Sequence, residues 1–335
     1  MILAPVSSGS AGAFLTRTGR VWLFIESWLV GPWVGLYRLI VPRPACPADK
    51  DAPLPAGYLL RAQLPFLISM SLLAVAWALG APPRPAGFEK LVTIIGVTTG
   101  IVAVSLAWRS PWIERLALVA QIFVLDQYFK VLMRHCSHLA TYYDQWLFAL
   151  DQRLFGTWPI ALGNPQPGRM SEYWALVYSL FILYLFSSLF MNACGRSRRF
   201  AASYFAGVTL LYGTAYLGYV WLPARGPYAI EGLYATPLPP GKYMDVLHES
   251  FKLTDCFSGA FPSLHVGAVT YMLGVDWIFC RDRFFAYLPL ALSIAVSTVV
   301  LRMHYIIDLV AGALLAIGCV LLCARLARGG SSSSS

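Results

Sequence analysis

The chain has 335 residues, of which 58% are apolar and 12% charged, whereas an ordinary soluble domain contains about 45–50% apolar and about 25% charged residues. These values, with a mean hydropathy of +0.63, exclude a typical water-soluble globule. The net charge is +9. In so apolar a chain the basic residues are expected in loops that flank a membrane, so they do not by themselves indicate a nucleic-acid partner.

The N-terminal region contains an aromatic segment at 21–40 that is broken by Gly31 and Pro32. Because tryptophan and tyrosine favour the membrane surface, we expect an interfacial helix here and not a span. The residues before it lack a basic stretch followed by an apolar core and a cleavage site, so we expect no removable signal peptide.

Long uncharged blocks follow, and blocks of about 20 residues predict membrane-spanning helices. The clear blocks cover about 62–83, 91–108, 171–192, 200–224, 256–275 and 284–301. Two weaker blocks contain ionisable residues: 114–134 is interrupted by Asp126 and Lys130, and 304–324 begins at a histidine. Ionisable side chains inside a span are rare and usually functional. We therefore predict an all-α, polytopic integral membrane bundle with about eight transmembrane helices.

The basic residues are unevenly distributed between the two sides of this bundle. If both termini lie on one side, that side collects 15 of the 25 basic residues, including the short loops at 195–199 and 281–283. The opposite side receives the long loops 135–170 and 225–260, in which acidic residues gather. The positive-inside bias therefore predicts cytoplasmic termini and extracytoplasmic long loops, and the composition favours a bacterial plasma membrane.

The seven cysteines form no CxxC pair and show no metal-ligand spacing, which disfavours a zinc site or a disulfide scaffold. Cys136 and Cys256 both fall on the predicted extracytoplasmic side, and the sequence leaves open whether they form a disulfide. His135, Cys136 and His138 lack a fourth ligand nearby, so interfacial polar residues are a better interpretation than a metal site. No metal is predicted.

One group of polar residues surrounds His265 in the sequence CFSGAFPSLHVGAV. Proline suits the first turn of a helix, so Pro262 predicts a helix start with Ser263 and His265 in that turn. Free backbone N–H groups and the helix dipole favour an anion at such a position. The segment therefore predicts a site that can hold a phosphate group.

A second group surrounds His304 in the sequence STVVLRMHYIIDLVAG. His304 and Asp308 are four residues apart, so on a helix they share a face and the carboxylate can accept one imidazole N–H. This fixes a tautomer whose other ring nitrogen is free to attack. Arg302 and Arg225 fall at the same predicted membrane face and supply planar, permanently charged donors suited to phosphate oxygens.

Each of these features alone has an ordinary structural interpretation, because a lone histidine or a His–Asp pair is often a satisfied polar group. Their combination at one membrane face favours a functional site, since the chain contains few charged residues. A transporter that binds an anionic lipid at the same charges is the alternative from another class. The chain shows no internal repeat, however, and the polar groups gather at one rim.

Two segments resemble the second and third signatures of the type 2 phosphatidic acid phosphatase superfamily: FPSLH at 261–265 and RMHYIID at 302–308. The match is closest to the inositolphosphotransferase branch, which includes the fungal inositol phosphorylceramide synthases and many bacterial relatives. Similarity extends upstream through YYDQWLFALDQRLFG at 142–156 and SEYWALVYSLF at 171–181. The resemblance covers about 120–325.

Together with the predicted spans, the resemblance divides the chain into four parts. These are a cytoplasmic N-terminal segment with the interfacial helix (1–56), two additional transmembrane helices (57–110), a six-helix phosphatase-type core (111–325) and a flexible tail (326–335). The resemblance also implies a phosphohistidine intermediate, a lipid phosphate ester as substrate, no metal and no soluble cofactor.

The resemblance assigns roles residue by residue. His304 would be the nucleophile, Asp308 would orient it, and His265 would protonate the leaving group. The phosphate oxygens would be held by Arg225, Arg302 and Ser263, with help from backbone amides at the helix start.

Three departures from the lipid phosphatases accompany the resemblance. Gly218 stands where they have a lysine, PSLH replaces their PSGH, and Ser297-Thr298 replaces the Ser-Arg that lies six residues before their histidine. The arginine here is only two residues before the histidine, and on a continuous helix it would point about 200° away from it. We therefore expect a helix break near Met303.

These departures favour transfer over hydrolysis. We expect a membrane phosphotransferase that moves a phospho-headgroup, of the phosphoinositol type, between lipids at the outer leaflet, with a lipid alcohol or water as acceptor. The alternative is a lipid phosphate phosphatase acting on phosphatidic acid or a polyprenyl phosphate. Segment 142–158 either roofs the site or packs beside it. The sequence leaves open the donor and acceptor lipids, the oligomeric state and the role of residues 1–110.

Overall fold

The computed structural model describes residues 56–80, 111–136, 142–163, 168–194, 197–230, 232–234, 237–254 and 259–328, with isolated residues between 92 and 103. The expectations for 21–40, His138 and Cys256 lie outside the described residues, as does most of 91–108. Within the described ranges every regular element is a helix, apart from one isolated β-bridge between Ala224 and Gly259. The predicted all-α class is confirmed.

In chain order the elements are α2 (Ala56–Gly80), α4 (Pro111–Cys136), α5 (Asp144–Phe155), α6 (Trp158–Leu162), α7 (Gly168–Cys194), α8 (Arg198–Trp221), the 3₁₀ turn η2 (Pro227–Ala229), α9 (Lys242–Thr254), α10 (Leu264–Phe279), α11 (Arg281–Val300) and α12 (Ile306–Arg328). By length and composition, three of the described helices, α7, α11 and α12, could cross a membrane. Helix α10 is apolar but shorter.

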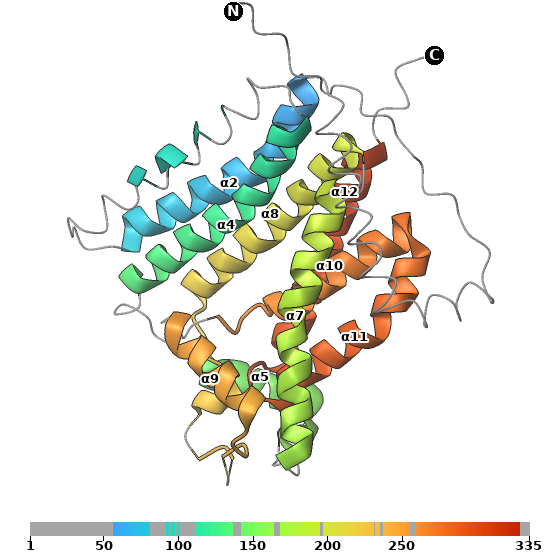
Figure 1. The fold of residues 1–335 in the computed structure, drawn as a ribbon. Helices are drawn as coiled ribbons and strands as arrows, with labels where there is room; N and C mark the ends of the chain where they lie inside the picture. Colours follow the sequence, from blue (N-terminus) through green and yellow to red (C-terminus); the bar gives the residue numbers. More distant parts are fainter. Residues whose placement is uncertain are drawn as a thin grey trace, which may run out of the picture.

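Helix α8 is the central element of the bundle. It packs against α2, α4, α7, α10 and α12, and Figure 1 shows α2 and α4 running alongside it. Its buried small residues, such as Ala201, Ala206 and Gly207, allow close approach of neighbouring helices. Helices α5 and α9 lie at one end of the bundle, where α8 ends and α12 begins (Figure 1).

Two helix starts differ from the sequence predictions, and both differences place residues of the candidate site. In the block predicted at 256–275, the described residues 259–263 are not helical and α10 begins at Leu264, where Ser263 caps the helix. Helix α12 begins at Ile306, so His304 precedes the helix instead of lying in it. Both histidine segments therefore consist of a helix start and the non-helical residues before it. Side chains of these non-helical residues can point in directions that a continuous helix would not allow.

The weaker predicted block at 114–134 is a continuous helix, α4. The two charged residues that interrupt it, Asp126 and Lys130, neutralise each other, because Lys130 Nζ lies 2.7 Å from Asp126 Oδ2 one helical turn away. The Tyr216 hydroxyl on α8 donates to the other carboxylate oxygen of Asp126 at 3.3 Å. Partners for both charges explain how this helix tolerates them inside an apolar bundle.

The starts of α10 and α12 cross at a pair of glycines. A Cβ atom on Gly312 would lie 2.3 Å from the carbonyl oxygen of Ser263, and one on Gly267 would lie 3.2 Å from the carbonyl oxygen of Gly312. Glycine at these positions permits backbone contact between the helices. This contact brings the segments of His265 and His304 together.

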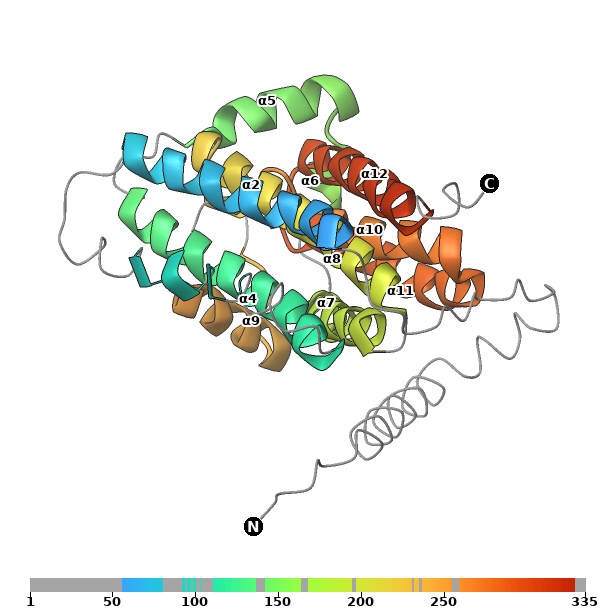
Figure 2. The same ribbon diagram turned by 90° about the horizontal axis from the view of Figure 1, so that it is seen from above.

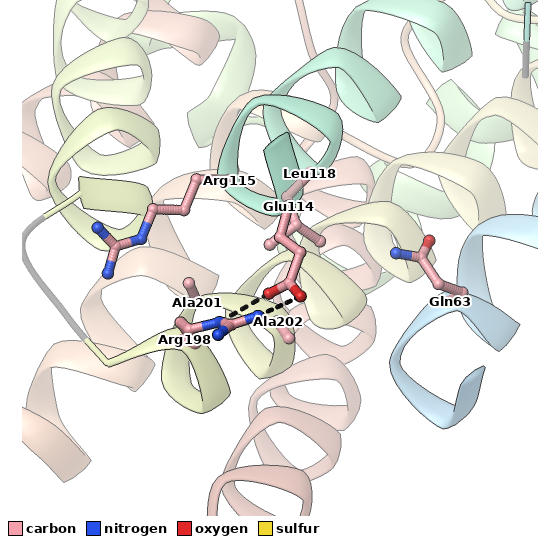
Figure 3. A pocket seen from close by; sticks show the side chains of 7 residues that line it. All are labelled: Gln63, Glu114, Arg115, Leu118, Arg198, Ala201 and Ala202. Atoms are coloured by element: carbon pink, nitrogen blue, oxygen red, sulfur yellow. Dashed lines mark hydrogen bonds and ion pairs between the residues drawn. The ribbon is translucent and has the colours of Figure 1, made fainter. Parts of the chain in front are cut away.

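A buried ion pair joins α4 and α8 at the end of the bundle away from α5. Arg198 Nε donates to Glu114 Oε2 at 2.9 Å, and Arg198 Nη2 donates to Glu114 Oε1. Figure 3 shows the guanidinium and carboxylate aligned for this two-point contact, whereas Arg115 points away. Because both side chains are buried, loss of either partner would leave an uncompensated charge, at a cost of about 3–5 kcal/mol.

Candidate active site

His304 lies in the turn between α11 and α12 and is buried, with 4% of its surface exposed. Its Nδ1 is 2.9 Å from the carbonyl oxygen of Ala260. A carbonyl can only accept a hydrogen bond, so we assign a ring proton to Nδ1. The tautomer with its proton on Nδ1 has a lone pair on Nε2, the atom through which a nucleophilic histidine would attack.

Asp308 is fully buried and is the third residue of α12. Its Oδ2 accepts from the N–H of Tyr305 at 2.9 Å, in the manner of a capping box, and lies 3.5 Å from His304 Nδ1. The predicted pair therefore comes together, but the Ala260 carbonyl is the nearer partner of the ring. That Asp308 orients His304 stays a prediction, and the structure adds the Ala260 carbonyl as a second partner of the same ring nitrogen.

The predicted helix break is present and is centred on Arg302. Its φ of 62° is the left-handed conformation, which few non-glycine residues adopt. The N–H of Arg302 donates to the Val299 carbonyl, and the N–H of Met303 donates to the Thr298 carbonyl. This pair of bonds is the Schellman arrangement that ends a helix. Helix α11 therefore ends before the site. The direction of the His304 side chain is not fixed by the rotation per residue of that helix.

His265 lies in the first turn of α10 and is half-buried. Its ring packs between Tyr178 and Phe181 of α7, with centroid separations of 4.4 and 4.5 Å. The Tyr178 hydroxyl is 3.5 Å from His265 Nδ1. The centroids of the His265 and His304 rings are 5.7 Å apart, a separation in which one phosphorus-bound oxygen can reach both imidazoles.

Ser263 is the N-cap of α10. Its Oγ accepts from the N–H of Val266 at 3.4 Å, and its own N–H donates to the Asp308 carbonyl at 3.0 Å. The side chain therefore has a structural role that the sequence analysis did not assign to it. The hydroxyl proton is still available to donate, so contact between Ser263 and a phosphate oxygen stays a prediction.

The Arg302 side chain is 5% exposed and is held from two sides. Its Nε donates to the Gly163 carbonyl at 2.8 Å, and its guanidinium carbon lies 3.9 Å from the centroid of the Tyr234 ring. Burial lowers the pKa of Arg302, while the neighbouring Tyr234 raises it. An arginine remains charged after such a shift, so the turn carries a fixed positive charge beside His304.

Arg225 follows the end of α8, and its side chain is exposed. Its guanidinium carbon lies 3.9 Å from the centroid of the Tyr142 ring. The next residue, Gly226, has a φ of 111°, and a Cβ there would lie 2.2 Å from the Met303 carbonyl oxygen. The structure therefore brings the backbone of this segment against the His304 turn, whereas the Arg225 side chain extends along Tyr142.

Asp144, at the start of α5, is a site residue whose role the sequence analysis left undecided. Its Oδ1 accepts from the N–H of Arg225 at 3.0 Å, the N–H of Gly226 at 2.8 Å and the hydroxyl of Tyr305 at 3.1 Å. One buried carboxylate thus links α5, the segment after α8 and the residue that follows His304. Segment 142–158 packs against the site through this group.

Asp151 lies two turns along α5 and is also buried. Its Oδ1 accepts from the N–H of Ile307 at 2.9 Å, at the start of α12. Burial raises the pKa of Asp151, and the N–H groups of Ile306 and Ile307 oppose that rise. The seven-residue spacing of the two carboxylates places them on the same face of α5 as Leu147.

Within the described ranges, no three His, Cys, Asp or Glu side chains gather in a group that could hold a metal ion. The side chains of His135 and Cys136 are not described, and neither is Cys256. The possible pairing of Cys136 with Cys256 therefore stays open.

We expect Asp144→Asn to destabilise the protein, because an amide carries less charge for the N–H donors and presents its own NH₂ to them. The loss should be about 1.5–3 kcal/mol, the range for hydrogen bonds to charged groups. Thermal denaturation of the purified protein measures it. The matched control is Gln145→Ala, one residue along and exposed, which should change the midpoint little. Equal midpoints for the two variants would contradict the anchoring role of Asp144.

A family model described as the PAP2 superfamily matches residues 145–322, which is more than half of the chain. Comparisons with curated proteins and with solved structures gave no match. The matched range begins within α5 and ends within α12, so it includes both histidine turns and the carboxylate at Asp151. The chain therefore belongs to the PAP2 superfamily, whose chemistry is that of phosphatases and phosphotransferases acting on lipid phosphates in membranes.

Proposed function

We propose that the protein is a lipid phosphotransferase, which moves a phospho-headgroup of the phosphoinositol type from one lipid to another through a phosphohistidine. The observation that carries this proposal is the pairing of His304, whose Nδ1 donates to the Ala260 carbonyl, with His265 at a ring separation of 5.7 Å. One ring can attack phosphorus while the other exchanges a proton with the group that leaves or arrives.

The reaction follows in two balanced steps. His304 Nε2 forms a bond to phosphorus as the bond to the donor alkoxide breaks, and His265 gives its proton to that alkoxide. An acceptor hydroxyl then loses its proton to His265 and attacks phosphorus, which releases His304. Arg225, Arg302 and the hydroxyl of Ser263 would stabilise charge on the phosphate oxygens, and Asp308 with the Ala260 carbonyl would stabilise the imidazolium side of His304.

The close packing of Gly218 against Pro262 leaves no room for a lysine at position 218. The site therefore has one cation fewer than that of the lipid phosphatases, which favours a phosphodiester as the donor. A Cβ atom on Gly218 would lie 2.6 Å from Pro262 Cδ, so a larger side chain would displace the segment that carries Ser263 and His265. No lysine fits at 218 while that segment keeps its place. A phosphodiester carries one negative charge and a monoester up to two, so a site with fewer cations suits the diester better. A phospholipid whose phosphate is a diester, such as phosphatidylinositol, meets that requirement.

The surroundings of His265 favour an alcohol over water in the second step. Tyr178 and Phe181 cover its ring, and Leu264 stands beside it where the lipid phosphatases have glycine. Apolar side chains around a reactive intermediate exclude water. The lipid alcohol would reach the intermediate from the membrane, with ceramide or diacylglycerol as candidate acceptors. Hydrolysis by a phosphatase of the same family is the alternative, since it shares the first step.

Replacement of the two histidines should separate the roles proposed for them. His304→Ala should lower turnover by orders of magnitude with any donor, since no covalent intermediate can form. His265→Ala should lose about 10²–10⁴-fold with a lipid donor but retain an initial burst with a diester of p-nitrophenol, which leaves without a proton. Stopped-flow absorbance records the burst. A burst from His304→Ala would rule out His304 as the nucleophile.

We also propose that the site opens to the extracytoplasmic face. The basic residues Arg198, Arg199, Arg281 and Arg283, from the predicted short loops, lie in the first turns of α8 and α11, and these helices end at the site. These residues therefore lie at the opposite end of the bundle from His265. Short basic loops favour the cytoplasm.

The orientation can be measured with two exposed positions, Gln145 beside the site and Arg325 near the other end of α12. In a variant without native cysteines, Gln145→Cys should react with an impermeant thiol reagent on intact cells. Arg325→Cys should react only after permeabilisation. The reverse pattern would place the site in the cytoplasm.

Transfer and hydrolysis are distinguished by the fate of the phosphate. The purified protein is incubated with phosphate-labelled phosphatidylinositol, with and without ceramide or diacylglycerol, and the lipids are separated. We expect the label in a new lipid only when an acceptor is present. Label found only in free phosphate or in a water-soluble headgroup phosphate, whatever the alcohol, would establish hydrolysis and overturn the transferase proposal.

A further inference from the structure

Helix α5 is amphipathic in an unusual way, because its polar carboxylates face the protein. Asp144, Leu147 and Asp151 are buried and fall within about 60° on a helical wheel. The contacts of this face with α12 and η2 leave the other sides of α5 uncovered by described residues. Those other sides differ in polarity.

One flank of α5 is apolar. Trp146 is 55% exposed and Leu154 is 57% exposed, with the half-buried Leu150 between them. At 100° per residue the three side chains lie within about 80° of each other. The exposed residues Gln145 and Gln152 lie about 150° from the centre of this flank, and about 20° from each other. The helix therefore has a protein face, an apolar flank and a polar flank.

Helix α5 also lies beside a helix, α12, that exposes apolar side chains. Helix α5 packs beside the start of α12, and Figure 2 shows it at the periphery of the bundle. Along α12 the side chains Val310, Leu314 and Ile317 are exposed, as expected for a span in contact with lipid. A tryptophan and two leucines on one side and glutamines on the other match a helix that lies in the membrane surface.

We propose that Trp146, Leu150 and Leu154 form a membrane-contact surface that seats α5 in the headgroup–acyl boundary of the bilayer. The occupant of this flank is bilayer lipid. The seated helix holds Asp144 against Arg225 and Tyr305, and it holds Asp151 against the start of α12. The bilayer thereby stabilises the arrangement of the site, and this consequence rests on the proposed function.

The position of α5 is tested without any measurement of activity. Leu154→Cys and Gln152→Cys, in a variant without native cysteines, are labelled with the fluorophore NBD and reconstituted in phosphatidylcholine–phosphatidylglycerol vesicles. At position 154 a doxyl-labelled lipid should quench at least threefold more than at 152, and aqueous iodide should show the reverse order. Equal quenching by each agent at the two positions would overturn the membrane contact.

The effect of the membrane contact on the active site is tested by introducing an aspartate on the apolar flank or on the polar flank. Leu154→Asp should lower turnover at least tenfold in vesicles, whereas the control Gln152→Asp, two residues away, should stay within twofold. Equal turnover would overturn the coupling. If neither variant nor the parent protein transfers or hydrolyses lipid phosphate, the proposed function fails, while the quenching result still decides where α5 lies.

Discussion

The candidate site depends on a direct backbone contact between the starts of α10 and α12. The N–H of Ser263 donates to the Asp308 carbonyl at 3.0 Å, and Gly312 leaves room for the Ser263 carbonyl. Because main chains make this contact, few rotatable bonds separate the rings of His265 and His304. The rings are therefore held 5.7 Å apart by the fold itself, which is the preorganisation that the proposed attack on phosphorus and proton transfer would require.

Carboxylates from neighbouring elements satisfy the helix starts of α12 and α9. Asp151 of α5 accepts from the start of α12, and Glu172 of α7 accepts from the N–H groups of Tyr243 and Met244 at the start of α9. An unsatisfied N–H group is costly in an apolar environment, and a negative charge also complements the helix dipole. Each carboxylate thus fixes the position of a second element as well as its own.

The sequence was sufficient for the parts of the site that depend on local geometry. The four-residue spacing of His304 and Asp308 predicted their proximity, and the angle between Arg302 and His304 predicted the break between α11 and α12. The Ala260 carbonyl could not be predicted as the partner of His304, because it lies 44 residues away in the chain and any residue provides a carbonyl.

The inward orientation of α5 was equally inaccessible from sequence. Asp144, Leu147 and Asp151 share a face, but so do Trp146, Leu150 and Leu154, and ordinary patterning would bury the second set and expose the first. That rule does not hold for a helix in the membrane surface, the position that we propose for α5, because lipid would cover its apolar flank. The acceptors in α5 are needed by N–H groups and a hydroxyl on other elements, and only the assembled fold reveals this requirement.

Main-chain contacts join the segment of Arg225 to the segment of Arg302. These contacts limit which substitutions can add a positive charge to the site without moving its backbone. The N–H of Tyr228 donates to the Arg302 carbonyl at 3.0 Å, and Gly226 touches the Met303 carbonyl. Gly218 likewise touches the Pro262 segment. A lysine at 218 would therefore displace backbone that positions both histidines as well as adding a charge. Conversion of this site to one that favours a doubly charged monoester requires compensating changes in the 261–263 segment, so a single substitution at 218 is not sufficient.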